Sequence, residues 1–162
     1  MAKKKGLWYI GIRRDKGGKK MNGDRVNKTL MMIEAMNDGA SLEEMLKKAE
    51  PMKPLPELIL PRLRDMSFDT LGVLAGCSRA NIYKLMSGKS HPEKDMLLRI
   101  AFVLHMNLDE VQQMLKSAHR SPLSAGDRRD VCVMYGLMNS LDGSEMDAVL
   151  EKQGFSPLWP EE

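Results

Sequence analysis

The stretch 66–92, MSFDTLGVLAGCSRANIYKLMSGKSHP, constrains the fold more than any other part of the chain. Ser67 is a candidate N-cap at the start of a helical pattern. The apolar residues after it recur at helical spacing: Phe68, Leu71, Leu74 and Ala75. Gly76 ends this pattern, and Ser78 is placed to cap a second helix. The stretch therefore predicts two short helices joined by a tight turn.

The second predicted helix, Arg79–Met86, has an apolar and a polar side. Ile82 and Leu85 are spaced to reach a core, whereas the polar residues face outward: Arg79, Asn81, Tyr83 and Lys84. A helix, a glycine-containing turn and a second helix with an exposed polar face are the parts of a helix-turn-helix, whose second helix enters the major groove of DNA.

A longer pattern surrounds these helices. Its positions are filled by Met66, Ser67, Leu71, Gly76, Cys77, Ser78, Ile82, Leu85, Gly88, Lys89 and Pro92, and it continues through Leu97, Ile100, Ala101, Leu104 and Leu108-Asp109-Glu110. Over about Pro56–Ala118 the chain resembles the lambda-repressor/Cro-like (Xre-type) helix-turn-helix family. The resemblance implies an all-α module and a sequence-specific transcriptional regulator that binds double-stranded DNA, as a homodimer. The DNA-binding residues that it implies are Ser67, Arg79, Asn81, Tyr83, Lys84 and Lys89.

Two residues depart from the pattern of that family. Phe68 replaces the glutamine that opens the first helix, and Gly72 replaces an alanine, which weakens that helix by about 1 kcal/mol. Val73 adds an apolar residue where a solvated one is expected. If Phe68 and Val73 form an exposed patch, they suit a protein partner, and the chain is a non-catalytic adaptor or an antitoxin-like regulator. The alternative is that Phe68 folds back into the core.

The first twenty residues carry most of the positive charge. Met1–Lys20 holds eight basic residues and one acid, a charge of +7, whereas the whole chain carries +3, which leaves +3 − 7 = −4 for the remainder. One interpretation is a basic arm that neutralises phosphates. The other is a translated ribosome-binding region upstream of a natural start at Met21. We expect this leader to contribute no packed element, unless its apolar residues 7–12 pair as a short strand.

Two helical hairpins are predicted to flank the module. The first occupies 21–55, with a helix at 24–37 marked by Val26, Leu30, Ile33 and Met36, and a second helix opened by a Ser41–Glu44 capping box. The module itself spans 56–120. The last hairpin spans 121–162: a helix at 127–139 with Val131, Met134, Tyr135 and Met138 on one face, and another helix starting at Ser144.

The two hairpins share sequence features. Asp24–Leu55 and Asp127–Leu158 both open with Asp-Arg, contain Met-Asn before a glycine-bearing turn, and close with Pro-Leu. We interpret this as an internal repeat, although any two amphipathic hairpins share some features. Such hairpins cannot bury their apolar faces alone, so we expect them to pack on the module or on each other, or to dimerise.

Catalytic and metal-binding patterns are not found. His91, His105 and His119 are not at ligand spacing with Cys77 or Cys132, and neither a nucleophile elbow nor a phosphate-binding loop occurs. We expect no enzyme activity, no metal and no cofactor. No apolar run is long enough to span a membrane, and the two cysteines fit buried free thiols, so a cytoplasmic protein is expected.

Overall fold

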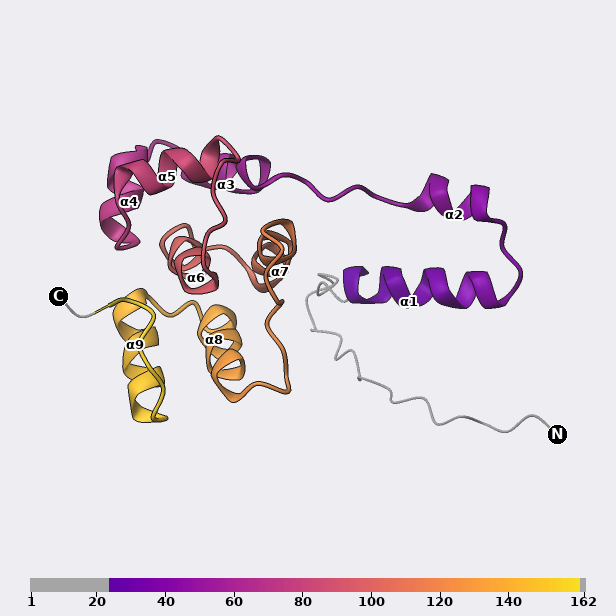
Figure 1. The fold of residues 1–162 in the computed structure, drawn as a ribbon. Coiled ribbons are helices and arrows are strands. Elements are labelled where there is room, and N and C mark those ends of the chain that lie inside the picture. The colour runs from indigo at the N-terminus through magenta and orange to yellow at the C-terminus, as the bar shows by residue number, and fades with distance from the viewer. Residues whose placement is uncertain (1–23, 161–162) are drawn as a thin grey trace. The chain divides into compact units, whose positions relative to one another are not determined.

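The computed structural model describes the fold of residues 24–160 (Figure 1). The expectations for the leader, Met1–Lys20, therefore lie outside the described residues. The described residues form nine α-helices and no strand, which confirms the all-α prediction. None of these helices is both long and apolar enough to cross a membrane. The described residues divide into two compact units, one that ends at Glu50 and one that begins at Pro51.

The first unit contains a helical hairpin. Its helices are α1 (Asp24–Asn37) and α2 (Leu42–Lys48), close to the predicted bounds. The predicted capping box is present: the amide of Glu44 donates to Ser41 Oγ over 3.3 Å, and the amide of Ser41 donates to Glu44 Oε2 over 3.2 Å. Met45 is buried, but the predicted apolar positions of α1 are exposed: Leu30, Ile33 and Met36.

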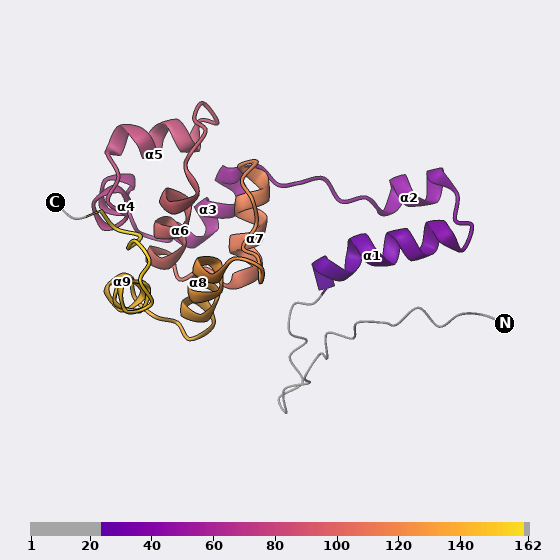
Figure 2. The same cartoon turned by 60° about the horizontal axis from the view of Figure 1, so that its bottom comes forward.

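Seven helices make up the described part of the second unit (Figures 1 and 2). They are α3 (Leu55–Leu63), α4 (Phe68–Leu74), α5 (Arg79–Met86), α6 (Lys94–Val103), α7 (Leu108–Ser117), α8 (Arg128–Met138) and α9 (Gly143–Lys152). Helix α6 packs against α4, α7 and α9. It therefore supplies the centre of the core, with Leu97, Leu98, Ile100 and Ala101 fully buried.

Helices α4 and α5 pack tightly across a four-residue turn, 75–78. The hydroxyls of Ser67 and Ser78 cap the two helices as predicted. The turn closes because the amide of Cys77 donates to the carbonyl of Gly72 over 2.8 Å. A Cβ at Gly72 would lie 2.9 Å from the carbonyl oxygen of Cys77. Glycine at position 72 thus permits this close approach of backbone to backbone, in addition to weakening the helix.

The buried face of α8 differs from the predicted one. Val131, Tyr135 and Met138 are exposed, and the buried residues of α8 are instead Asp130, Val133 and Gly136. Glycine at position 136 explains the choice of face, because Met146 of α9 and Phe102 of α6 pack against the space that a side chain would fill. Helical periodicity predicted that the more apolar face of α8 is buried. The face with Gly136 is buried instead, because the neighbouring helices can pack closely only where a side chain is absent.

Helix α9 begins earlier than predicted. Its N-cap is Asp142, which forms a capping box with Glu145, so the helix starts one residue before the predicted Ser144. Gly143 is the first helical residue. A Cβ there would lie 2.8 Å from Cη2 of Trp159. This glycine serves the packing of an aromatic ring against the helix.

The boundary predicted after residue 120 falls inside one compact unit. The ion pairs Lys94–Asp130 (3.0 Å) and Arg129–Asp95 (2.9 Å) join α8 and its N-terminal region to α6. The side chain of Gln112 also exchanges two hydrogen bonds with the backbone of Leu123, over 2.7 and 2.8 Å. Residues 121–160 are therefore packed on the preceding helices as part of the same core.

The internal repeat stays a prediction. The α1–α2 and α8–α9 turns close with equivalent bonds, from Ala40 N to the carbonyl of Ala35 and from Leu141 N to that of Gly136. However, α5 ends with the same kind of bond, from Lys89 N to the carbonyl of Lys84. The shared turn is therefore a general way of ending a helix and does not distinguish repetition from chance.

The close approach at Gly72 leads to a stability prediction. Gly72→Ala should lower the free energy of unfolding by about 1–3 kcal/mol, because the new methyl group meets a backbone oxygen that cannot move independently. This outcome opposes helix propensity, which favours alanine by about 1 kcal/mol. Urea unfolding followed by circular dichroism measures the change.

Gly126→Ala provides the control, since a Cβ there has its nearest neighbour at 3.5 Å, the hydroxyl of Ser124. A Gly72→Ala variant as stable as the wild-type protein, or more stable, would show that the turn accommodates a methyl group at position 72.

Candidate nucleic-acid interface

Helix α5 presents one polar face to solvent. Ile82 and Leu85 are buried at 0% and 1% exposure, which fixes the orientation of the helix. The sequence-predicted residues Arg79, Asn81, Tyr83 and Lys84 are all exposed. In both views α5 lies at the outer edge of its unit (Figures 1 and 2). The structure thus brings these four side chains onto one accessible helix.

A cluster of four side chains joins the starts of α4 and α5. Arg79 Nε lies 2.9 Å from Asp69 Oδ1, and the Arg79 guanidinium also donates to the hydroxyl of Tyr83 over 3.3 Å. The Arg79 guanidinium carbon lies 5.2 Å from the centroid of the Tyr83 ring. Phe68 meets the same ring edge-on, with 5.1 Å between centroids. The hydrogen bond with Tyr83, followed by the charge of Asp69, raises the pKa of Arg79.

Phe68 is therefore not a member of an exposed patch. Its side chain is half-buried and packs against both the core and Tyr83. Val73, by contrast, is 80% exposed. Of the two alternatives for Phe68, the structure favours packing toward the core over an exposed patch with Val73, and Tyr83 of the next helix supplies a partner for the ring. Asp69 was missed by the sequence reasoning, since its ion pair with Arg79 spans ten residues and leaves no local pattern.

The other predicted site residues have different surroundings. Asn81, Lys84 and Lys89 are exposed, and their side chains make no hydrogen bond or ion pair within the described part of the chain. Ser67 is occupied, because its hydroxyl accepts a bond from the amide of Thr70 over 3.1 Å and also meets the Thr70 hydroxyl. Three side chains are thus free to contact a ligand, and Ser67 serves first as a cap.

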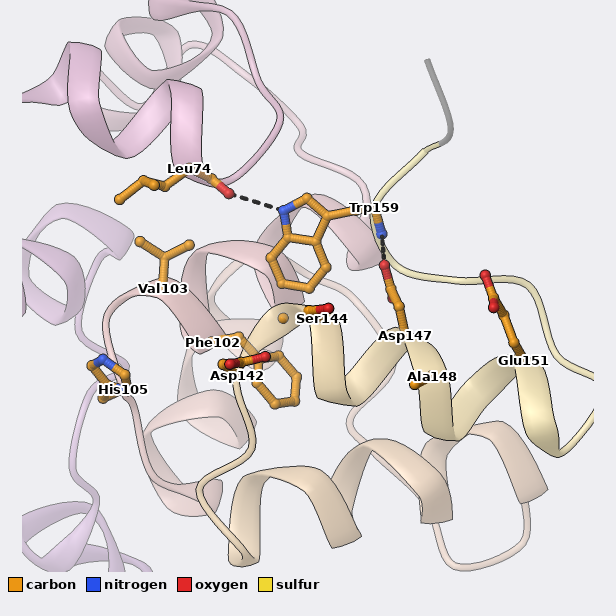
Figure 3. Close-up of a pocket in the computed structure, with 11 residues that line it drawn as sticks. Leu74, Phe102, Val103, His105, Asp142, Ser144, Asp147, Ala148, Glu151 and Trp159 are labelled. Carbon is orange, nitrogen blue, oxygen red and sulfur yellow. Dashed lines mark hydrogen bonds between the residues drawn. The ribbon is translucent and has the colours of Figure 1, made fainter.

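The C-terminal segment fixes the other end of α4 (Figure 3). The indole Nε1 of Trp159 donates to the carbonyl of Leu74 over 2.9 Å, and the guanidinium of Arg99 donates to the carbonyl of Ala75 over 2.7 Å. The carboxylate of Asp147 holds the segment by accepting from the amides of Leu158 and Trp159, over 2.6 and 3.2 Å. No sequence motif predicted these contacts.

Cys77, in the turn between α4 and α5, is a half-buried thiol. Burial raises the pKa of Cys77, and the nearby Arg99 partly offsets that rise. The turn is therefore a poor site for a reactive thiolate at neutral pH. No group of three or more histidine, cysteine or acidic side chains that could hold a metal ion occurs among residues 24–160.

Comparison of the chain with family models, with curated proteins and with solved structures finds no match.

The contact between Trp159 and α4 leads to a second stability prediction. Trp159→Phe keeps an aromatic ring but removes the donor to the carbonyl of Leu74, so the free energy of unfolding should fall by about 0.5–1.5 kcal/mol, plus a packing contribution. Thermal and urea unfolding measure it. Tyr135→Phe is the matched control, because the hydroxyl of this exposed residue makes no bond within the described residues. Equal stability of Trp159→Phe and wild type would contradict the assigned role of the indole.

Proposed function

We propose that this chain is a sequence-specific DNA-binding regulator in which α4 and α5 form a helix-turn-helix. The observation that carries the proposal is the polar face of α5, held outward by the buried Ile82 and Leu85. A helix of this width fits the major groove, and side chains on its first turn reach base edges. The resemblance of residues 56–118 to the lambda-repressor/Cro-like family supports the same assignment.

The proposed contacts divide into two kinds. Arg79 and Asn81, on the first turn of α5, contact base edges, with Tyr83 beside them. Lys84 and Lys89 contact phosphates of the DNA backbone. Ser67, at the start of α4, helps to position that backbone. Base contacts discriminate between sequences, whereas phosphate contacts attract all DNA alike. Residues 21–162 carry a net charge of −4, but the stretch 66–92 carries three basic residues and one acid. The attraction of DNA to this part of the chain therefore comes from the local positive charge of that stretch.

Arg79 has to change partners in this proposal. Its guanidinium is paired with Asp69 in the absence of DNA, and both side chains are more than half exposed. An exposed pair of this kind contributes little to stability, so the exchange costs little. A guanidinium that leaves Asp69 can bind the O6 and N7 atoms of guanine with two hydrogen bonds. The carboxylate left behind then repels nearby phosphates.

A homodimer completes the proposal, since two copies read two half-sites. The exposed apolar residues of α1 and α8 are surfaces that association would cover. The proposal contains no catalytic step, no metal and no cofactor.

A protein-binding adaptor is the second candidate. Val73 is 80% exposed and Leu74 is 48% exposed at the end of α4, which favours a protein contact there. The adaptor predicts no preference among DNA sequences, and this separates the two candidates.

Selection from random duplexes with the full chain should enrich one sequence. On that sequence Arg79→Ala or Asn81→Ala should cost about 1–3 kcal/mol of binding free energy, with little effect on random DNA. Lys89→Ala should weaken binding to both kinds of DNA and lower the salt slope by about one unit. Lys152→Ala, which removes the same charge from α9, should leave the salt slope unchanged. If no sequence is enriched and Lys89→Ala has no effect on the slope, the adaptor replaces the regulator.

Asp69→Asn tests the exchange of partners. It removes the competitor for Arg79 and a charge that repels phosphates, so affinity for DNA should rise about two- to five-fold. Fluorescence anisotropy with a labelled duplex measures the change, and Glu57→Gln on α3 controls for the loss of one acid. Weaker binding by Asp69→Asn would mean that the ion pair holds Arg79 in its reading position, against the proposed exchange.

A further inference from the structure

A groove lies between the end of α4, the end of α6 and one face of α9 (Figure 3). Its volume is about 700 Å³. The apolar part of its wall comes from three helices and the C-terminal segment: Leu74, Phe102, Val103, Ala148 and Trp159. Leu74 is 48% exposed although it stands in this wall. None of the residues that line the groove belongs to α5.

The ionisable side chains that line the groove are acidic apart from one histidine. They are Asp142, Asp147 and Glu151, with His105 at one end, and no lysine or arginine of the described residues is among the lining side chains. Asp147 and Glu151 lie four residues apart and therefore share one face of α9. The carboxylate of Asp147 accepts two backbone hydrogen bonds, whereas the side chain of Glu151 makes no hydrogen bond or ion pair within the described part of the chain. The groove thus joins an apolar wall to a negative rim.

Trp159 makes this wall rigid. Its amide donates to Asp147, and its indole nitrogen donates to the carbonyl of Leu74. Its ring contacts that of Phe102 in a T-shaped arrangement, with 6.4 Å between centroids. A wall that is already ordered loses little freedom when it binds a ligand. Apolar side chains of a ligand can therefore pack against this ring, whereas lysine or arginine side chains are attracted by the carboxylates of the rim.

We propose that this groove binds a cationic amphipathic segment of a partner protein, its apolar side chains against Trp159 and Leu74 and its lysine or arginine side chains beside Glu151 and Asp142. A short helix in a groove is one of the common ways in which a protein recognises a peptide, and a volume of about 700 Å³ holds a few side chains of such a helix. The proposal is independent of DNA binding by α5.

The experiment uses the full chain with Trp8→Phe, which leaves Trp159 as the single tryptophan of the two in the sequence. The probe is a labelled amphipathic helical peptide of leucine and lysine, and the comparison peptide has every lysine replaced by glutamate. Residues 21–162 carry a net charge of −4, which attracts any lysine peptide, so the groove variants below are needed to show that binding comes from this local site. We expect the lysine peptide to bind, to change the emission of Trp159 and to bind more weakly at high salt.

Ala148→Lys blocks the groove in the test. Ala148 is an exposed residue in the wall, so lysine there adds bulk and a like charge without disturbing the core. Peptide affinity should fall at least about ten-fold. Ala125→Lys, in an exposed loop, adds the same charge outside the groove and should leave the affinity unchanged. Glu151→Gln should weaken binding about two- to five-fold.

Circular dichroism melting confirms that each variant is folded. Equal binding of the lysine and glutamate peptides, or wild-type affinity in folded Ala148→Lys, would overturn the proposal. Binding that leaves the emission of Trp159 unchanged would place the peptide elsewhere and overturn it as well. A result confined to this groove does not bear on α5, because selection of DNA sequences tests that helix separately.

Discussion

The carbonyl groups at the C-terminal end of α4 depend on donors from distant parts of the chain. A helix leaves its last carbonyls without partners inside the helix, and here Arg99 of α6 and Trp159 of the C-terminal segment bond two of them. The turn to α5 begins at this point, so the direction of α5 follows from how α4 ends. Gly72 allows the turn to pass close to α4, and Gly143 allows the ring of Trp159 to lie on α9. The exposed face of α5 thus rests on contacts made by three other segments.

The charges at the start of α5 act differently in the free protein and in its proposed complex with DNA. Asp69 orders Arg79 and holds it over the Tyr83 ring, and Phe68 braces that ring from the other helix. The same carboxylate opposes a phosphate backbone. In the proposed complex Arg79 leaves Asp69, so this arrangement belongs to the free protein and is given up when DNA binds.

Local chemistry accounts for what could be predicted from the sequence. Helix starts such as those capped by Ser41, Ser67 and Ser78 need two or three neighbouring residues, and these were read correctly. The exposure of Arg79, Asn81 and Lys84 also followed from helical spacing. Contacts between distant segments could not be read in this way: the buried face of α8 depends on Gly136 meeting Met146, and Phe68 is covered by Tyr83. Asp69 and Trp159 went unnoticed for the same reason, because their partners lie ten and eighty-five residues away.

The bond between Trp159 and the carbonyl of Leu74 also orders events during synthesis. Its two residues are separated by 85 positions, and contacts of such separation form late because a long loop must first close. A ribosome that has reached residue 120 has made α3 to α7 entirely, yet the indole that completes α4 does not exist. The nascent chain therefore carries α4 and α5 with an unfinished junction until the last described residues emerge. The orientation of α5 becomes final only after the C-terminal segment has been made and has closed over α9.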